Sequence, residues 1–236
     1  MITAANPYAG LRVAVLGLGR SGLAAARLLK RCGASVLALD SGESPLLAER
    51  AALLLGEGIG VVTGGEALKD PTRHDLAVLS PGIEENAPLV LNVTSKGTPL
   101  IGELELAFTL AASPVIAITG TNGKTTTTEL TARMLRGAGM RAEACGNIGT
   151  PMSELLLGEE PGVFVAEVSS FQLETIRTFR PKVALWLNLS PNHLDRYPSM
   201  AEYREAKLRI FLNQTADDWA VVQHGSELPP LVVRVI

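Results

Sequence analysis

Short apolar runs alternate with helical stretches along the first part of the chain. The runs at 12–16, 36–39 and 76–79 are rich in valine, leucine and alanine, and they end at glycine, aspartate or serine. Continuous apolar runs of this length are typical of strands buried on both faces of a parallel sheet. Between the first two runs, Leu23, Leu28 and Leu29 fall on a helical repeat. The pattern predicts an α/β fold with helices on both faces of a parallel sheet.

A second unit of the same kind follows a break at 98–103. A helix is expected over 103–112, and apolar strands over 115–118, 163–168, 183–189 and 219–222. The helix after residue 123 is expected to carry Leu130, Met134 and Leu135 on one face, and Ser199 with Glu202 forms a capping box before another helix. We therefore expect two domains, 1–102 and 103–236, of which the second lacks some closing elements of its sheet.

Composition narrows the class of protein without identifying it. The chain has 236 residues, 47% of them hydrophobic, and a net charge of −3 without a basic cluster, so nucleic-acid binding is not expected. No apolar stretch is long enough to span a membrane, and no signal peptide is recognisable. Cys32 and Cys145 fit no metal or redox spacing, which favours reduced thiols in a cytoplasmic protein.

A glycine-rich turn follows the first predicted strand. Residues 17–22 read GLGRSG, a G-x-G-x-x-G between a strand and a helix, and Asp40 ends the next strand. Such glycines let the backbone approach a phosphate at the amino terminus of a helix. The motif alone favours NAD, with Asp40 on the ribose, although glycines that merely permit tight packing of helix on strand would give the same pattern.

A second glycine-rich loop lies between a predicted strand and a predicted helix. Residues 120–126 read GTNGKTT and resemble a P-loop, but Ile118 stands where the strict pattern needs its first glycine, so the loop is a shorter variant. Backbone N–H groups of such a loop cradle phosphates, Lys124 reaches the terminal phosphates, and the hydroxyl of Thr125 can bind Mg²⁺. The loop predicts an ATP site.

Three further residues are candidates whose pattern also allows a structural role. Glu167 ends the strand VFVAEV, where a carboxylate can hold Mg²⁺ or cap the following helix. His193 lies in a loop beyond a strand, the place where α/β sheets bind ligands, although a lone histidine is often merely solvated. Lys207 reads as a solvated helical lysine on periodicity alone. His74 and His224 have no such context and are expected at the surface.

Together these segments resemble the Mur ligases, the ATP-dependent amide-forming enzymes of peptidoglycan synthesis. GTNGKTT is similar to their shared ATP loop, and SPGI, SSFQLE and HLDRY are similar to the member that joins D-glutamate to UDP-N-acetylmuramoyl-L-alanine. The resemblance runs from about residue 11 to about residue 222. It implies a Rossmann-like first domain that binds the UDP part of the substrate instead of NAD, and a P-loop-type second domain that binds ATP.

The resemblance also assigns roles to single residues. It implies phosphate, uridine and muramoyl contacts in the first-domain cleft and at the domain junction, from Arg20, Ser21, Asp40, Ser41, Ser80, Gly82, Asn147, Ser169, Gln172 and His193. It implies ATP contacts from Gly120, Thr121, Asn122, Gly123, Lys124, Thr125 and Thr126, and Mg²⁺ contacts from Thr125, Glu167, His193 and Lys207. Lys124, His193 and Lys207 would be catalytic. Lys207 matches the family's lysine that reacts with CO₂, and the resulting carbamate would help to hold two Mg²⁺ ions.

The implied reaction has two steps. The substrate carboxylate attacks the γ-phosphate of ATP to give an acyl phosphate, and the amine of D-glutamate then displaces phosphate. The resemblance implies a cytoplasmic monomer. Two departures from it are expected to matter: Asn192 replaces the usual aspartate before His193, and relatives continue beyond the point where this chain ends. We therefore expect a C-terminally truncated chain that binds the UDP substrate without ligating it.

Three other classes of protein fit part of the sequence. A folylpolyglutamate or cyanophycin synthetase would share the ATP loop, but not SSFQLE or a UDP-type first domain. An NAD-dependent oxidoreductase would explain GLGRSG with Asp40 and leave the ATP loop without a role. A non-catalytic nucleotide-binding protein derived from a ligase would fit a chain that lacks the carboxyl-terminal part of its relatives.

Overall fold

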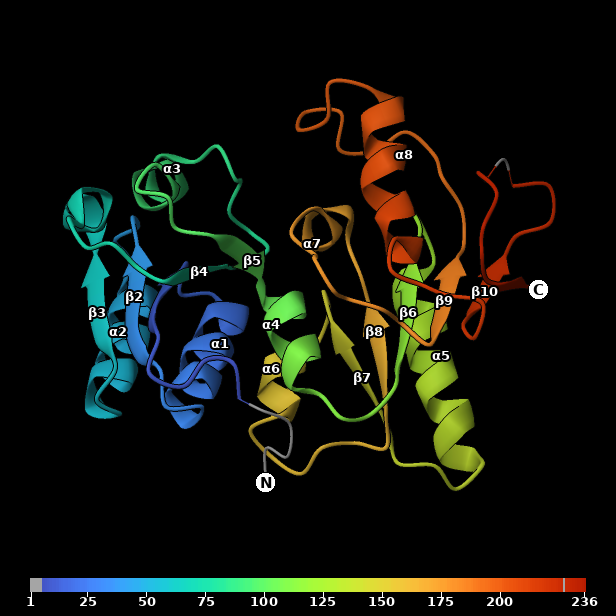
Figure 1. Ribbon diagram of the computed structural model, residues 1–236, viewed down its shortest axis with the longest axis horizontal. Helices are drawn as coiled ribbons and strands as arrows, with labels where there is room; N and C mark the ends of the chain where they lie inside the picture. The colour runs from blue at the N-terminus through green and yellow to red at the C-terminus, as the bar shows by residue number, and fades with distance from the viewer. Residues whose placement is uncertain (1–5, 227) are drawn as a thin grey trace.

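A computed structural model describes residues 6–226 and 228–236, so the first five residues of the expected first domain, and residue 227 of the expected second, lie outside the described residues. The chain forms two parallel sheets, each with helices packed on it, and Figure 1 shows them side by side with helices α4 and α6 between them. No helix in the described part of the chain is long and apolar enough to cross a membrane.

The first sheet has the strand order β3-β2-β1-β4-β5, and all of its strands are parallel. Its strands are β1 Arg12–Leu16, β2 Ser35–Asp40, β3 Gly60–Thr63, β4 Leu76–Leu79 and β5 Leu100–Gly102. The helices around it are α1 Arg20–Arg31, α2 Pro45–Gly56, the 3₁₀ helix η1 Gly64–Lys69, and α3 Pro88–Thr94. Because side chains alternate along a strand, Val13 and Val15 pack with α1 and α2, whereas Ala14 and Leu16 pack with η1 and α3.

The second sheet has the order β11-β10-β9-β6-β8-β7 and is also parallel throughout. Its strands are β6 Val115–Thr119, β7 Ala142–Gly146, β8 Val163–Glu167, β9 Val183–Trp186, β10 Trp219–Val222 and β11 Arg234–Val235. Its helices are α4 Glu103–Leu110, α5 Lys124–Gly137, α6 Met152–Leu155, α7 Ser170–Glu174, α8 Met200–Leu208 and the 3₁₀ helix η2 Arg209–Phe211. The two-sheet α/β architecture predicted from the alternation is confirmed.

The two sheets are joined through a shared helical layer. Leu28 of α1 belongs to the hydrophobic core of the second sheet, and Leu106 of α4 belongs to that of the first. The guanidinium of Arg31 donates hydrogen bonds to the carbonyls of Leu156 and Leu157, just after α6. Apolar packing and hydrogen bonds both cross the junction, and these contacts fix the position of one domain against the other.

The larger apolar residues of α5 are only partly packed against the sheet. Leu130 and Met134 of α5 are exposed, with 55% and 66% of their surface accessible, while Thr128 and Ala132 face the sheet. Small residues of α5 thus lie against the sheet instead of these two larger ones. The expected break at 98–103 contains β5, which pairs with β4 and leads directly into α4.

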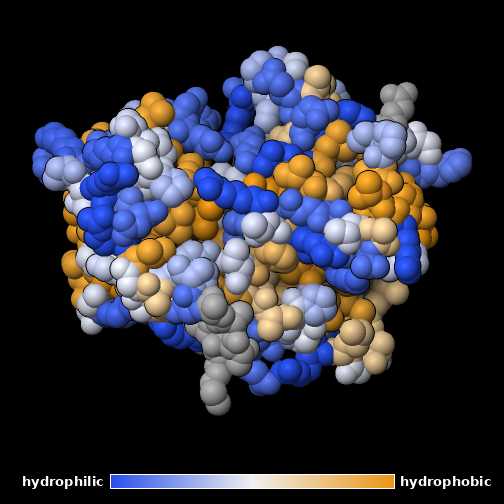
Figure 2. Space-filling view, in the orientation of Figure 1, coloured by the Kyte–Doolittle hydropathy of each residue, from blue (hydrophilic) through white to orange (hydrophobic). Residues whose placement is uncertain are grey.

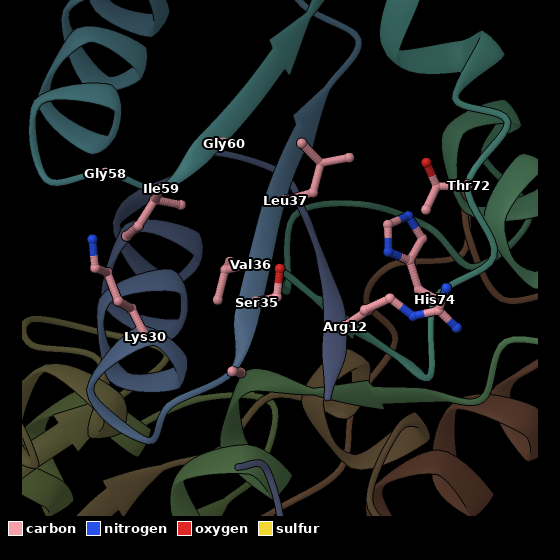
Figure 3. A pocket seen from close by; sticks show the side chains of 11 residues that line it. Arg12, Lys30, Ser35, Val36, Leu37, Gly58, Ile59, Gly60, Thr72 and His74 are labelled. Atoms are coloured by element: carbon pink, nitrogen blue, oxygen red, sulfur yellow. The ribbon is translucent and has the colours of Figure 1, made fainter. Parts of the chain in front are cut away.

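His74 was expected at the surface and is buried, whereas His224 is exposed as expected. Nε2 of His74 lies 2.8 Å from Oδ2 of Asp70. The ring lines a cavity of about 410 Å³ at the amino ends of β1, β2 and β3, where Figure 3 shows it near Leu37 and Thr72. Ligand sites of parallel sheets lie at the opposite, carboxyl ends of the strands, so this cavity is separate from the candidate site.

Gly22 has the tightest surroundings of the glycine turn. A Cβ atom at Gly22 would stand 1.8 Å from the carbonyl oxygen of Gly17 and 2.8 Å from Oγ of Ser80, whereas one at Gly19 would meet nothing within 4 Å. We expect Gly22→Ala to lower the free energy of unfolding by about 1–3 kcal/mol, because backbone must move to admit the methyl group. Gly19→Ala is the control without a steric conflict; because Gly19 is the N-cap of α1, it should lose up to about 1 kcal/mol, less than Gly22→Ala. Urea unfolding curves that coincide for the two variants would contradict this account of the turn.

Candidate nucleotide and substrate site

The second glycine-rich loop lies between β6 and α5, at the carboxyl edge of the second sheet. Gly120 has φ +156°, and a Cβ atom there would stand 2.9 Å from Cβ of Leu187. Gly123 is the N-cap of α5 with φ +80°, a left-handed conformation that favours glycine. Nζ of Lys124 donates to the carbonyl of Thr121 at 2.9 Å. Lys124 therefore folds back over the glycine loop. The amino terminus of α5 follows this loop, and helix amino termini of this kind bind phosphates.

Asn188, just after β9, fixes the conformation of this loop. Its Oδ1 accepts hydrogen bonds from the backbone N–H groups of Thr121 and Asn122 at 3.2 and 2.9 Å. Its Nδ2 donates to the carbonyl of Asn122 at 3.0 Å. The hydroxyl of Thr121 donates to the carbonyl of Ser190, which strengthens the same contact. The loop is thus held from the neighbouring strand end, a role of Asn188 that the sequence did not indicate.

Thr125 and Glu167 come together beside the loop. Oγ1 of Thr125 donates to Oε2 of Glu167 at 2.8 Å, although the two residues are 42 positions apart. Oε1 of Glu167 accepts a hydrogen bond from Nδ2 of Asn147 at 3.0 Å. A carboxylate and a hydroxyl in contact are oxygen donors of the kind that Mg²⁺ prefers next to nucleotide phosphates. These residues fit a magnesium ion.

Lys207 is buried, with 2% of its surface accessible, and is therefore not the solvated lysine that periodicity favoured. Its Nζ donates to the carbonyl of Gly120 at 3.0 Å and lies 4.8 Å from the ring centre of Tyr203. Burial lowers the pKa of Lys207 to about 7, and the positive charge of Lys124 acts in the same direction while Glu167 opposes it. A substantial fraction of this amine is neutral near pH 7, which makes it nucleophilic.

His193 and Lys207 both lie against Tyr203. His193 has φ +54°, and its backbone N–H donates to Oδ1 of Asn192. Its ring meets the rings of Phe171 and Tyr203 edge-on, at centroid distances of 5.0 and 6.0 Å. In residues 6–226 and 228–236, no group of three or more His, Cys, Asp or Glu side chains is arranged to hold a metal.

A cleft of about 750 Å³ lies between the two domains, and residues of both domains line it. Its first-domain wall contains the glycine turn and the ends of β2 and β4, with Arg20, Ser21, Asp40, Ser41, Ser80 and Gly82. Its second-domain wall contains Gly146, Asn147, Phe171 and Arg196. Figure 2 shows hydrophilic residues at the upper edge of the molecule, where the domains face each other. Asn147 belongs to this wall and also contacts Glu167, which in turn contacts Thr125 beside the glycine loop.

Asp40 and Ser80 shape the turn within this wall. Oδ2 of Asp40 accepts from the backbone N–H of Leu18 at 2.8 Å, and Oδ1 accepts from that of Gly42 at 2.9 Å. Oγ of Ser80 donates to the carbonyl of Gly17 at 3.0 Å. Both carboxylate oxygens of Asp40 are engaged by backbone, which makes it an organiser of the turn as well as a lining residue.

Ser169 and Gln172, like His193, differ from the other predicted substrate residues in that they do not line the cleft. Ser169 caps α7, and Gln172 completes the capping box by accepting the backbone N–H of Ser169 at 3.0 Å. Gln172 is buried, and neither residue lines the cleft of 750 Å³. Phe171 and Arg196 do line it, although the sequence did not single them out as site residues.

Thr126, one of the predicted ATP contacts, is exposed on the first turn of α5.

Comparison with known proteins links both domains to one family. Residues 11–102 match the family model described as Mur ligase MurD-like, N-terminal domain, and residues 118–231 match the Mur ligase middle domain. The chain is similar to UDP-N-acetylmuramoylalanine–D-glutamate ligases from Trichlorobacter lovleyi and Pelobacter propionicus, with 47% and 48% identity. Each alignment covers 92% of this chain and 49% of the relative. The chain thus spans about half the length of the curated relatives it matches.

Solved structures support the same fold. The chain is similar to a UDP-N-acetylmuramate:L-alanyl-γ-D-glutamyl-meso-diaminopimelate ligase from Neisseria meningitides, with a TM-score of 0.62 and 20% identity over 93% of this chain and 73% of that one. It is also similar to the UDP-N-acetylmuramate–alanine ligase MurC from Thermotoga maritima, with a TM-score of 0.57 and 25% identity over 92% of this chain and 50% of that one.

Proposed function

This chain belongs to the Mur ligase family, and from that premise we propose that it carries the UDP-substrate and ATP sites of a D-glutamate-adding ligase. The substrate would be UDP-N-acetylmuramoyl-L-alanine, and the whole protein would join D-glutamate to it in peptidoglycan synthesis. The proposal includes a first domain over 1–102, a middle domain over 103–236, and a cytoplasmic, monomeric protein.

The observation that carries the proposal is the contact between Asn147 and Glu167. Asn147 lines the cleft between the domains, and its Nδ2 lies 3.0 Å from Oε1 of Glu167, which in turn accepts the hydroxyl of Thr125. A substrate that spans the cleft can therefore present one end beside the ATP loop. An NAD-dependent oxidoreductase would need only the first-domain wall and would give this contact no function.

The residues of the site support an acyl-phosphate mechanism. The first-domain wall, with Arg20 and Ser21 at the amino terminus of α1, would bind the diphosphate. Lys124 would turn from the carbonyl of Thr121 to the terminal phosphates and neutralise charge as the γ-phosphoryl group moves to the substrate carboxylate. Mg²⁺ supplies further neutralisation of the phosphates when bound, and Thr125 and Glu167 would hold it. Attack by the amine of D-glutamate would then release phosphate and form the amide.

Lys207 would supply oxygen ligands for Mg²⁺ after its amine has reacted with CO₂. A protonated lysine repels Mg²⁺, whereas the carbamate of its neutral amine presents carboxylate oxygens. The carbamate and His193 would hold the second Mg²⁺ ion. The burial of Lys207 and its lowered pKa support this assignment, because only the neutral amine attacks CO₂.

The carbamate is expected to form at Lys207 as the pH rises through about 7, at constant CO₂ pressure. Below that pH the amine is protonated and unreactive, and above it the neutral form dominates because the pKa is lowered to about 7. The measurement is ¹³C NMR of the chain under ¹³CO₂, with Lys207→Met as the control that has a side chain of similar length and no amine. A carbamate signal that is equally strong in Lys207→Met, or that needs a pH near 10, would refute the assignment.

Ligand-induced stabilisation tests the proposed substrate directly. UDP-N-acetylmuramoyl-L-alanine at 100 times its Kd should stabilise the chain by about 2.7 kcal/mol, which raises Tm by about 5–10 °C for a chain of this size. NAD at the same concentration should leave Tm unchanged. Stabilisation by NAD without stabilisation by the UDP substrate would favour the oxidoreductase instead.

A further inference from the structure

Arg196 lies on the second-domain wall of the cleft, in the loop between β9 and α8. It follows His193 by three residues, and its backbone N–H donates to the carbonyl of His193 at 3.1 Å. Its side chain is only 16% exposed. In the described structure none of its side-chain nitrogens is both fully buried and without a partner, so its remaining donors are accessible from the cleft.

The side chain of Arg196 is held flat. Its guanidinium carbon lies 3.8 Å from the ring centre of Phe171, and Nη2 forms an ion pair with Oε2 of Glu174 at 2.8 Å. Stacking on an aromatic ring and pairing with a carboxylate both fix the orientation of the planar group. Among residues 6–226 and 228–236, Glu174 is the hydrogen-bond partner of this side chain, and the bond uses Nη2 alone. The Nε and Nη1 donors are left for a ligand.

Phe171 connects this guanidinium to the ATP side of the site. The ring of Phe171 meets that of His193 edge-on at 5.0 Å and stacks against Tyr197 at 5.9 Å. The hydroxyl of Tyr197 donates to Glu174, the same carboxylate that pairs with Arg196. The wall around Arg196 is therefore packed as one unit with the loop that carries His193.

We propose that Arg196, oriented by Phe171 and Glu174, is a specificity-determining residue that recognises the acylated amino sugar of the substrate. This inference rests on the proposed function. The first-domain wall would bind the nucleotide of the substrate, and the terminal carboxylate would lie beside the ATP loop. The second-domain wall faces the stretch between these ends. Carbonyl oxygens of the N-acetyl and lactoyl groups are the acceptors available there for Nε and Nη1.

Binding of three ligands to the full chain separates this role from a merely structural one. Titration calorimetry would compare UDP, UDP-N-acetylglucosamine and UDP-N-acetylmuramoyl-L-alanine for the unaltered chain, Arg196→Ala, Glu174→Gln and Arg133→Ala. Glu174→Gln weakens the ion pair but keeps the guanidinium and an acceptor for Tyr197. Arg133→Ala makes the same charge change on the exposed face of α5.

Arg196→Ala is expected to lose about tenfold or more in affinity for the muramoyl substrate, the usual effect of removing charged hydrogen bonds. Its affinity for UDP should change less than about twofold, which also shows that the first domain is folded. Glu174→Gln should lose less than about threefold, and Arg133→Ala should not change.

Equal losses in Arg196→Ala and Glu174→Gln would overturn the inference, because the ion pair would then serve the structure alone. An Arg196→Ala variant whose affinity for the muramoyl substrate falls no more than its affinity for UDP would also overturn the inference while leaving the proposed function intact. Failure of the unaltered chain to bind any UDP ligand would overturn both.

Discussion

Replacing Lys124 with alanine is expected to weaken MgATP binding by about 100-fold or more. The side chain carries a positive charge in contact with the glycine loop, and hydrogen bonds to charged groups contribute about 1.5–3 kcal/mol each. In the described structure Nζ contacts only the carbonyl of Thr121, so its loss should leave the fold intact. Titration calorimetry with a non-hydrolysable ATP analogue measures the effect.

Arg133→Ala is the control for Lys124→Ala, because it removes one positive charge from the exposed face of the same helix. It should leave nucleotide affinity unchanged. Lys124→Ala should also raise the pKa of Lys207, since the positive charge of Lys124 contributes to lowering it. ATP affinity that is the same in both variants would show that the loop does not bind phosphates.

Replacing Glu105 with alanine is expected to lower the free energy of unfolding by about 3 kcal/mol or more. This buried carboxylate accepts hydrogen bonds from the backbone N–H groups of Arg177, Thr178 and Phe179 at 2.9, 2.7 and 3.0 Å, and from the hydroxyl of Thr178 at 2.6 Å. Each donor left without an acceptor costs about 1–3 kcal/mol when it is buried. Guanidinium unfolding at pH 7 would measure the loss.

Two controls separate the anchoring role of Glu105 from its charge. Glu105→Gln keeps one oxygen acceptor and should lose less than the alanine variant. Glu129→Ala removes an exposed carboxylate from α5 and should change stability by about 0.5 kcal/mol or less. If Glu105→Ala were as mild as Glu129→Ala, the contact between α4 and residues 177–179 would not hold the second domain together.

The sequence predicted the parts of the fold and site that depend on local pattern. Apolar runs identified most strands, and glycine spacing identified both turns, because φ and close backbone approach restrict those positions to glycine. Glu167 was found because it ends such a run. Parallel strands end at one edge of a sheet, which is why Glu167 and Thr125 meet although they are far apart in sequence.

Features that depend on packing between distant segments were not predicted. Asn188 holds the ATP loop through its side-chain amide, and no spacing rule connects it to Thr121 and Asn122. Arg196 stands out only when Phe171 is seen beneath it. The burial of Lys207 could not be deduced from helical periodicity, since its neighbours are the loop and α8 together.

The central claim is that the cleft and the glycine loop form one site for one reaction. Its most direct test is a crystal structure of the chain with UDP-N-acetylmuramoyl-L-alanine and a magnesium complex of a non-hydrolysable ATP analogue. The account predicts the diphosphate at the turn of residues 17–22 and the alanine carboxylate next to the terminal phosphate, beside Lys124 and Glu167. A substrate bound with its carboxylate pointing away from the ATP loop, or bound outside the cleft, would contradict it.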